Sequence, residues 1–185
     1  MGILMSIALI RFCYSALRIC VVVAMLALHP PWATASSDAV TAEPFLVVTL
    51  DADLPGGAAE LWLGFSALSE LPVTDYLTST VWTDGVASFS GVLLWDLLLH
   101  LGIDPVTWQG SMTFYAIDGY LARIGSEVVT QQAPILALLK NGQPMARRRH
   151  GPYWVVFPYD ADPAFRTETI FSLSVWQVDR VSVAP

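Results

Sequence analysis

The chain has 185 residues, 55% of them hydrophobic and 14% charged, and its formal net charge at pH 7 is −7. A chain of this length fits one ordinary domain. Because an acidic surface repels the phosphates of DNA and RNA, we expect no nucleic acid partner. Both cysteines, Cys13 and Cys20, lie close to the N-terminus.

The first 35 residues have the order of a secretory signal. Arg11 and Arg18 precede an almost wholly apolar run at residues 19–28, and Ala33-Thr34-Ala35 gives the small-x-small pattern of a cleavage site. An uncleaved anchor is the alternative, because residues 1–10 are also apolar. The run is about ten residues long, however, whereas a membrane span needs roughly 20. We expect cleavage after Ala35, a periplasmic protein and no stable membrane insertion after cleavage.

Cleavage would remove both cysteines, so the exported protein would have no thiolate and no disulfide. Cysteine redox chemistry would thereby be excluded. Seven basic side chains would remain against all 16 acidic ones. Residues 36–44 are mostly small and polar, which is typical of a flexible tether. We expect a single folded domain over residues 45–185.

The first elements of that domain are strands. Residues 45–50 are rich in β-branched and large apolar side chains, and residues 51–57 supply turn chemistry after them. Residues 61–63 predict a second strand. Ser66 is a candidate N-cap for a short helix that runs to about Leu71.

A clear helix and further strands follow. Leucines at positions 94, 97, 98 and 101 have the spacing of one helical face, which predicts a helix over 93–101 that ends at Gly102. Strands are predicted at 112–117, 120–124, 135–139, 153–158 and 173–183. Asp118-Gly119 and Asn141-Gly142 suit tight hairpin turns. The predicted fold class is α+β, with mostly β mixed sheets and a few short helices.

Five short motifs follow one another between residues 89 and 176. They are FSGVLLWDLL from Phe89, DGY from Asp118, LLKNGQP from Leu138, HGPYWVVFP from His150 and SVW from Ser174. In this order they resemble the successive signatures of the sulfite-oxidase-type molybdopterin domain. The resemblance covers residues 90–185, about half of the chain, and it implies that fold.

The chain departs from that family at the residue that ligates the metal. The family's enzymes hold molybdenum through a cysteine thiolate before the Gly-Val-x-Leu segment, and residues 78–85 contain no cysteine. A Thr80 hydroxyl or an Asp84 carboxylate is the alternative ligand. The runs from Thr80 to Gly85, from Gly151 to Asp160 and from Val175 to Gln177 resemble the small periplasmic proteins that bind a pterin without being molybdoenzymes.

That second resemblance implies a function of binding rather than catalysis. It implies a pterin-binding sensory protein, with no molybdenum and no catalytic residues, that regulates an inner-membrane signalling partner such as a cyclic di-GMP enzyme or a sensor kinase. The alternative is a molybdopterin-dependent oxidoreductase with a metal ligand other than cysteine. A third possibility is a domain that has lost its ligand and acts only through protein contacts.

The chemistry of a pterin selects candidate contacts among these residues. Its flat ring suits the aromatic side chains Trp82, Tyr153, Trp154 and Trp176. Its pyrimidine edge presents two N–H donors, which suit one carboxylate. Asp160, at the end of a strand, ranks first, Asp84 is the alternative, and Asp118 is better explained as a turn residue.

The run Arg147-Arg148-Arg149 is the densest group of charges in the chain. A guanidinium can clasp a phosphate or a ring carbonyl through paired hydrogen bonds, and Arg149 is the best candidate for this contact. A solvated loop, or a patch that touches a partner or anionic lipid, is the alternative. The predicted ligand-binding residues are therefore Thr80, Trp82, Asp84, Arg149, Tyr153, Trp154, Asp160 and Trp176.

Overall fold

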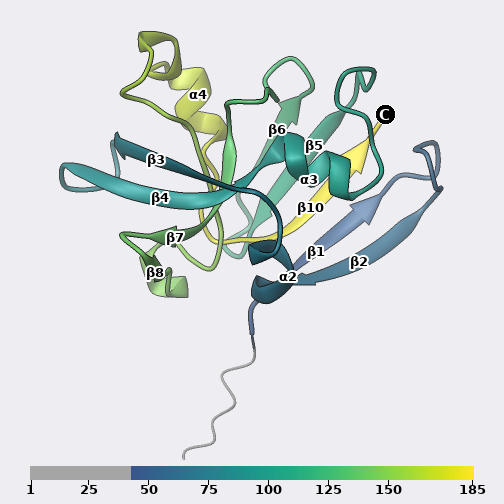
Figure 1. Ribbon diagram of the computed structural model, residues 1–185, viewed down its shortest axis with the longest axis horizontal. Helices are drawn as coiled ribbons and strands as arrows, with labels where there is room; N and C mark the ends of the chain where they lie inside the picture. Colours follow the sequence, from purple (N-terminus) through teal and green to yellow (C-terminus); the bar gives the residue numbers. More distant parts are fainter. Residues whose placement is uncertain (1–42) are drawn as a thin grey trace, which may run out of the picture. The chain divides into compact units, whose positions relative to one another are not determined.

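The structure is a computed structural model, and it describes residues 43–185. The expected signal segment, residues 1–35, and most of the expected tether, residues 36–44, lie outside the described residues. Figure 1 shows the described part as two β-sheets with a few short helices. None of its helices is long and apolar enough to cross a membrane.

The first sheet has five strands in the order β2-β1-β10-β5-β6. Its strands are β1 (Phe45–Leu50), β2 (Ala59–Gly64), β5 (Ser111–Ala116), β6 (Leu121–Gly125) and β10 (Val178–Ala184). β1 and β10 pair in parallel, so the first and last strands of the domain lie side by side, whereas the other neighbours are antiparallel. The strands predicted for this sheet at 45–50, 61–63, 112–117 and 120–124 are confirmed.

The second sheet has the order β3-β4-β7-β8, and a further strand, β9, pairs with β7. Its strands are β3 (Val73–Ser79), β4 (Val86–Leu93), β7 (Ile135–Lys140), β8 (Gln143–Pro144) and β9 (Trp154–Val156). All of its pairings are antiparallel. Asn141 and Gly142, with φ angles of 51° and 72°, form the β7–β8 turn, which confirms the predicted hairpin.

Short helices connect the strands. They are α2 (Phe65–Ser69), α3 (Leu94–His100), α4 (Glu168–Leu173) and the 3₁₀ turns η1 (Arg147–Arg149) and η2 (Pro163–Phe165). The helix predicted over 93–101 is α3, and Leu94, Leu97 and Leu98 on its apolar face are fully buried. Residues from both sheets and from α3 join in one hydrophobic core.

Two local predictions were wrong. Gly64, not Ser66, is the N-cap of α2, and the carboxylate of Glu43 accepts the Ser66 backbone N–H in place of a capping side chain. The strand predicted at 173–183 begins only at Val178. Leu173 is the last residue of α4, where the Thr167 hydroxyl accepts the N–H of Ile170, and residues 174–177 belong to no helix or strand.

The strand predicted at 153–158 is shorter than expected. β9 ends at Val156, and Pro158, which has no backbone N–H to donate, belongs to the segment that leaves the sheet. The loop that follows carries Asp160, whose carboxylate bonds to Ser79 at the end of β3.

Candidate functional site

Trp82 lies in the loop between β3 and β4, the longest hairpin of the second sheet (Figure 1). The loop is shaped by Thr80, whose hydroxyl accepts the backbone N–H of Trp82 at 3.1 Å and shares a 2.8 Å hydrogen bond with Thr83. These bonds form a local turn of the kind that threonine favours. Trp82 is thereby held in a fixed position although it lies in a loop.

Trp82 is the centre of a cluster of aromatic rings. Its ring centroid is 5.9 Å from Trp154, 5.8 Å from Phe171 and 5.2 Å from Trp176, in edge-to-face geometry. Such contacts each contribute on the order of 1 kcal/mol beyond area burial. The sequence prediction named three of these four rings. Phe171 was missed because α4 was not predicted.

A pocket of about 340 Å³ opens beside this cluster, and we call it the aromatic pocket. Its walls come from the β3–β4 loop, the β5–β6 turn, α4 and the segment after α4. The lining residues are Trp82, Asp118, Tyr120, Phe171, Ser172, Ser174 and Trp176. Two of the predicted ligand-binding residues, Trp82 and Trp176, therefore share a pocket.

Asp118 is the carboxylate that lines this pocket. One of its oxygens accepts the backbone N–H of Tyr120 at 3.0 Å, as expected of a turn residue before Gly119. The Tyr120 hydroxyl donates to the carbonyl of Ser172 at 2.7 Å and so joins the turn to the end of α4. The turn signal in the sequence was correct, but it did not reveal that the same residue lines a pocket.

Trp154 is the member of the cluster that is fully buried. His150 stacks on its ring with a centroid separation of 4.6 Å and an interplanar angle of 26°. Within residues 43–185, the indole Nε1 of Trp154 has no hydrogen-bond partner. A buried donor without an acceptor costs about 1–3 kcal/mol. An acceptor brought by a ligand is one way to remove that cost.

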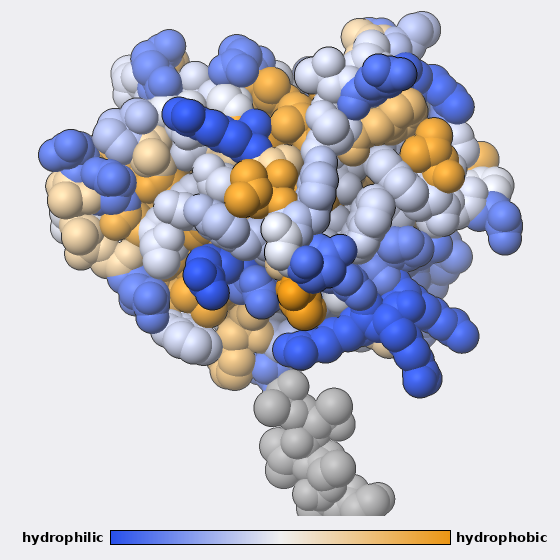
Figure 2. All heavy atoms as spheres, turned by 180° about the vertical axis from the view of Figure 1, so that it is seen from behind, coloured by the Kyte–Doolittle hydropathy of each residue, from blue (hydrophilic) through white to orange (hydrophobic). Residues whose placement is uncertain are grey.

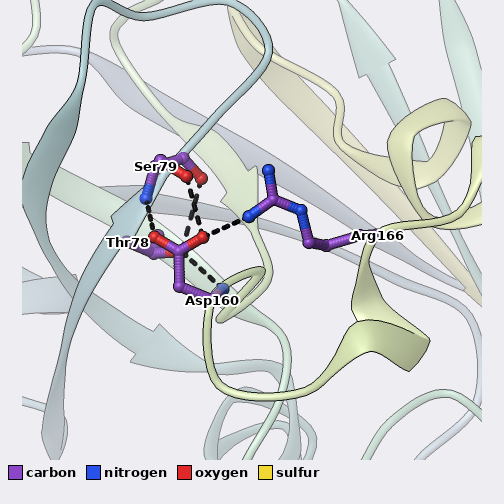
Figure 3. Close-up of polar contacts among 4 residues, drawn as sticks. All are labelled: Thr78, Ser79, Asp160 and Arg166. Carbon is purple, nitrogen blue, oxygen red and sulfur yellow. Dashed lines mark hydrogen bonds and ion pairs between the residues drawn. The ribbon is translucent and has the colours of Figure 1, made fainter.

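Asp160 connects two loops that border the cluster (Figure 3). Its carboxylate accepts the backbone N–H of Ser79 at 2.5 Å, the Ser79 hydroxyl at 2.8 Å and an Arg166 N–H at 2.5 Å. Its own backbone N–H donates to the hydroxyl of Thr78 at 3.1 Å. The segment after β9 is thereby fastened to the end of β3, and both carboxylate oxygens already have partners inside the protein.

These bonds lower the pKa of Asp160 below its usual value, first through the Ser79 backbone N–H, then through the Ser79 hydroxyl and Arg166. A carboxyl whose pKa is lowered on folding stabilises the protein above its unfolded pKa, and the contribution is lost as the pH falls through the folded value. We expect the melting temperature to decrease as the pH falls below about 4.

The variant Asp160→Asn should lower the melting temperature at pH 7 and flatten its decrease at acid pH, as measured by circular dichroism. Asp84→Asn is the matched control, since Asp84 is exposed. Equal acid profiles for wild type and Asp160→Asn would contradict this role.

The remaining predicted residues lie in different places. Tyr153 is fully buried and donates its hydroxyl to the carbonyl of Pro44 at 2.7 Å, and burial raises its pKa. Asp84 lies exposed in the β3–β4 loop. Arg149, on η1, lines a different cleft together with Arg148 and His150. Within residues 43–185, no three His, Cys, Asp or Glu side chains come together as a metal site would require.

The fold is α+β, mostly strands in two sheets with a few short helices, as the motifs predict for a sulfite-oxidase-type domain. No family model and no curated protein matches the sequence. Among solved structures, the fold is similar to that of the sulfane dehydrogenase SoxCD from Paracoccus pantotrophus, with a TM-score of 0.52 and 20% sequence identity. The likeness covers 76% of this chain and 38% of that chain, so this chain spans well under half of its neighbour's length. At this identity, the likeness is one of fold.

Proposed function

We propose that this protein binds a pterin in the aromatic pocket. The observation that carries the proposal is the arrangement of Trp82, Phe171 and Trp176 around a pocket that also contains a carboxylate. Ligand pockets usually combine apolar and aromatic walls with a few polar groups that fix orientation. A pterin is a flat, π-rich ring with a polar edge, and it matches both properties.

The residues that line the aromatic pocket fit a pterin at two points. The indole rings of Trp82 and Trp176 supply flat apolar surface. Asp118 supplies a carboxylate, one oxygen of which stays available while the other accepts the Tyr120 N–H.

Asp118 replaces Asp160 as the proposed partner of the pyrimidine edge. The carboxylate of Asp160 is already bonded to Ser79 and Arg166, so a ligand would have to displace those partners. Asp118 lines the aromatic pocket itself and has a free oxygen for a ring N–H.

Asp118→Asn is expected to weaken pterin binding about ten- to a hundredfold, since a hydrogen bond to a charged group contributes about 1.5–3 kcal/mol. The substitution keeps the oxygen that accepts the Tyr120 N–H, so the turn and the pocket walls remain. Calorimetric titration with a reduced pterin measures the change. Asp84→Asn, at the exposed carboxylate of the β3–β4 loop, serves as the control and should bind within twofold of wild type. Equal losses in both variants would contradict the assignment.

We further propose that the protein works in the periplasm, without molybdenum, as a sensor for an inner-membrane signalling partner such as a cyclic di-GMP enzyme or a sensor kinase. The signal-like N-terminus supports the location, and the absence of cysteine after Ala35 supports binding without molybdenum. The resemblance of the Thr80–Gly85 and Gly151–Asp160 segments supports the signalling role. Protein recovered from its native periplasm should carry a pterin chromophore and no stoichiometric molybdenum.

A second candidate is a molybdopterin-dependent oxidoreductase with a ligand other than cysteine. One observation favours it: the solved structure of similar fold is named a dehydrogenase. Elemental analysis of the same native preparation separates the two candidates. One molybdenum per chain would support the enzyme and contradict our proposal, whereas a pterin without metal would exclude this alternative.

A further inference from the structure

A second cleft, of about 650 Å³, lies at the end of the second sheet. Four of its lining side chains are basic or can become so: Lys140, Arg148, Arg149 and His150. Asn141 and Gln143 add amide groups, and none of the lining residues is acidic. We call this the basic cleft. In a chain of net charge −7, such a concentration of positive charge is unusual, and Figure 2 shows dense hydrophilic surface at the corner of the molecule that holds β8 and η1.

The cations of this cleft are not neutralised by residues 43–185. The only ion pair among those residues joins Arg166 to Asp160, and it lies elsewhere. Lys140 places its ammonium 5.9 Å above the ring of Phe89, a contact that leaves its charge without a counter-ion. Like charges held in one cleft repel each other, and this repulsion is unfavourable. A bound anion would attract the same cations and make the electrostatic energy of the cleft favourable.

The walls of the cleft are fixed by hydrogen bonds. Asn141, in the β7–β8 turn, accepts the N–H of Ser88 at 3.0 Å through its side-chain oxygen, which leaves its NH₂ group as a donor. On the other wall, the Gln177 side chain donates to the carbonyl of Arg147 at 2.5 Å. The N–H groups of Arg149 and Gly151 both donate to the carbonyl of Ala146. Arg148 and Arg149 are therefore presented from an anchored turn.

Close packing holds the same turn in place. A Cβ atom at Gly151 would clash with the carbonyl group of Met145, so the backbone passes there without space for a side chain. His150 has a φ angle of 71°, in the left-handed region that asparagine, aspartate and histidine adopt more often than other residues besides glycine. A turn built in this way fixes the backbone of Arg148 and Arg149 at the rim of the cleft before any ligand arrives.

We propose that the basic cleft binds an anion of the phosphate class, as a site separate from the aromatic pocket. The chemistry fits because a guanidinium fork matches two phosphate oxygens, and a dianion can use several cations at once. The two cavities share no lining residue. The inference does not depend on pterin binding, and phosphate binding and pterin binding can succeed or fail independently.

His150 provides a contact between the two sites. It lines the basic cleft, stacks on Trp154 and meets the ring of Trp176 edge to face at 5.7 Å. Burial, and then the positive charge of Lys140, lower its pKa. An anion in the cleft, which Arg148 and Arg149 also line, would oppose the effect of Lys140 and favour the protonated imidazole. Anion binding should therefore strengthen as the pH falls, and tryptophan fluorescence should change on binding.

The first test is a calorimetric titration of the purified protein with inorganic phosphate at pH 7 and low salt. The double variant R148A/R149A should bind at least tenfold more weakly. Arg147→Ala is the matched control, because Arg147 lies in the same turn but does not line the cleft, and it should bind within twofold of wild type. No phosphate binding, or an equal loss in Arg147→Ala, would overturn the proposal.

The pH arm uses sulfate, whose charge is constant in this range. Wild type should bind sulfate about threefold or more tightly at pH 6 than at pH 8, since each unit of induced pKa shift permits up to a tenfold change. His150→Asn places there a residue that also tolerates positive φ but does not titrate. The sulfate affinity of this variant should therefore differ by less than twofold between pH 6 and pH 8. A pH dependence that persists in His150→Asn would contradict the assigned role of His150.

Two sources could supply the phosphate group, and a third arm separates them. Vesicles of phosphatidylcholine with about 30% phosphatidylglycerol would retain the protein, and free phosphate would release it, if the ligand is a lipid headgroup. Binding of free phosphate without retention on these vesicles would assign the site to a soluble phosphate compound. Retention that R148A/R149A does not reduce would contradict the cleft as the binding site.

Discussion

Trp82→Ala should weaken the binding of a reduced pterin about ten- to a hundredfold. The indole lines the aromatic pocket and contacts Trp154, Phe171 and Trp176. Stacking of a flat heterocycle on an aromatic side chain contributes about 1–3 kcal/mol by alanine substitution, and each 1.4 kcal/mol or so corresponds to a factor of ten in affinity. Calorimetric titration measures the loss, and Trp82→Phe should recover part of it.

The control for this prediction is Trp62→Ala. Trp62 is 62% exposed, whereas Trp82 is half-buried, and Trp62 lies on β2 and outside the pocket. Thermal melts of both variants show whether the fold is intact. If a folded Trp82→Ala variant kept wild-type affinity, or if Trp62→Ala lost as much, the aromatic pocket would not be the pterin site.

Gly91→Ala should lower the free energy of unfolding by about 3 kcal/mol or more, because a side chain there meets the backbone of β7. A Cβ atom at Gly91 would clash with the carbonyl oxygen of Leu136 and would lie 2.6 Å from the Cα of Ala137. The pairing of β4 with β7 also shifts its register between Ser90 and Gly91. Overpacking a core costs about 1–3 kcal/mol, and more where backbone must move.

Urea denaturation of Gly91→Ala and of a comparison variant, Gly119→Ala, tests this cause. Gly119 has a φ angle of 90°, and a Cβ atom placed there would have no other atom within 4 Å in the described part of the chain. Only backbone strain opposes a side chain at Gly119, and strain of this kind costs about 1–2 kcal/mol. A loss in Gly91→Ala no larger than that in Gly119→Ala would contradict the steric account.

Several strands and α3 could be predicted because their signals are local. The apolar run at residues 45–50 and the leucine spacing of α3 each reflect a buried face, and both elements formed where expected. Gly119, Asn141 and Gly142 adopt the positive φ angles that their hairpin turns require. The order of motifs predicted the class of fold for the same reason, since each motif marks one element or turn.

β3 and β4 were not predicted as strands, although they carry the loop that holds Trp82. β3 is mostly exposed or half-buried, with only Tyr76 and Thr78 inside, and its mixed composition gives no continuous apolar run. The apolar end of β4 runs directly into α3, so the leucines of the helix dominate the pattern there. The position of Trp82 in a hairpin therefore had no clear signal.

The composition of the site could not be predicted to the same degree, because it depends on contacts between distant segments. Asp160 follows a strand, as a binding carboxylate often does, yet Ser79 and Arg166 already bind it. Asp118 was explained by its turn, and its place in the aromatic pocket depends on how α4 packs against β6. Tyr153 carries no sequence signal that its hydroxyl would meet the carbonyl of Pro44.

The arginine run shows a second limit of sequence reasoning. The sequence identified a dense positive charge but could not separate a solvated loop from a binding site. The structure brings Lys140 and His150 to Arg148 and Arg149, and only that combination makes a cleft without acidic residues. Arg147, the neighbour in the same turn, does not line it, a distinction that the sequence alone does not contain.

The central claim, that the aromatic pocket binds a pterin, is tested most directly by calorimetric titration of the purified protein with a series of reduced and oxidised pterins. We predict saturable binding of one pterin per chain, with an affinity that Trp82→Ala reduces at least tenfold and Trp62→Ala leaves unchanged. The absence of saturable binding by every pterin, in protein that melts cooperatively and carries no ligand, would contradict the account.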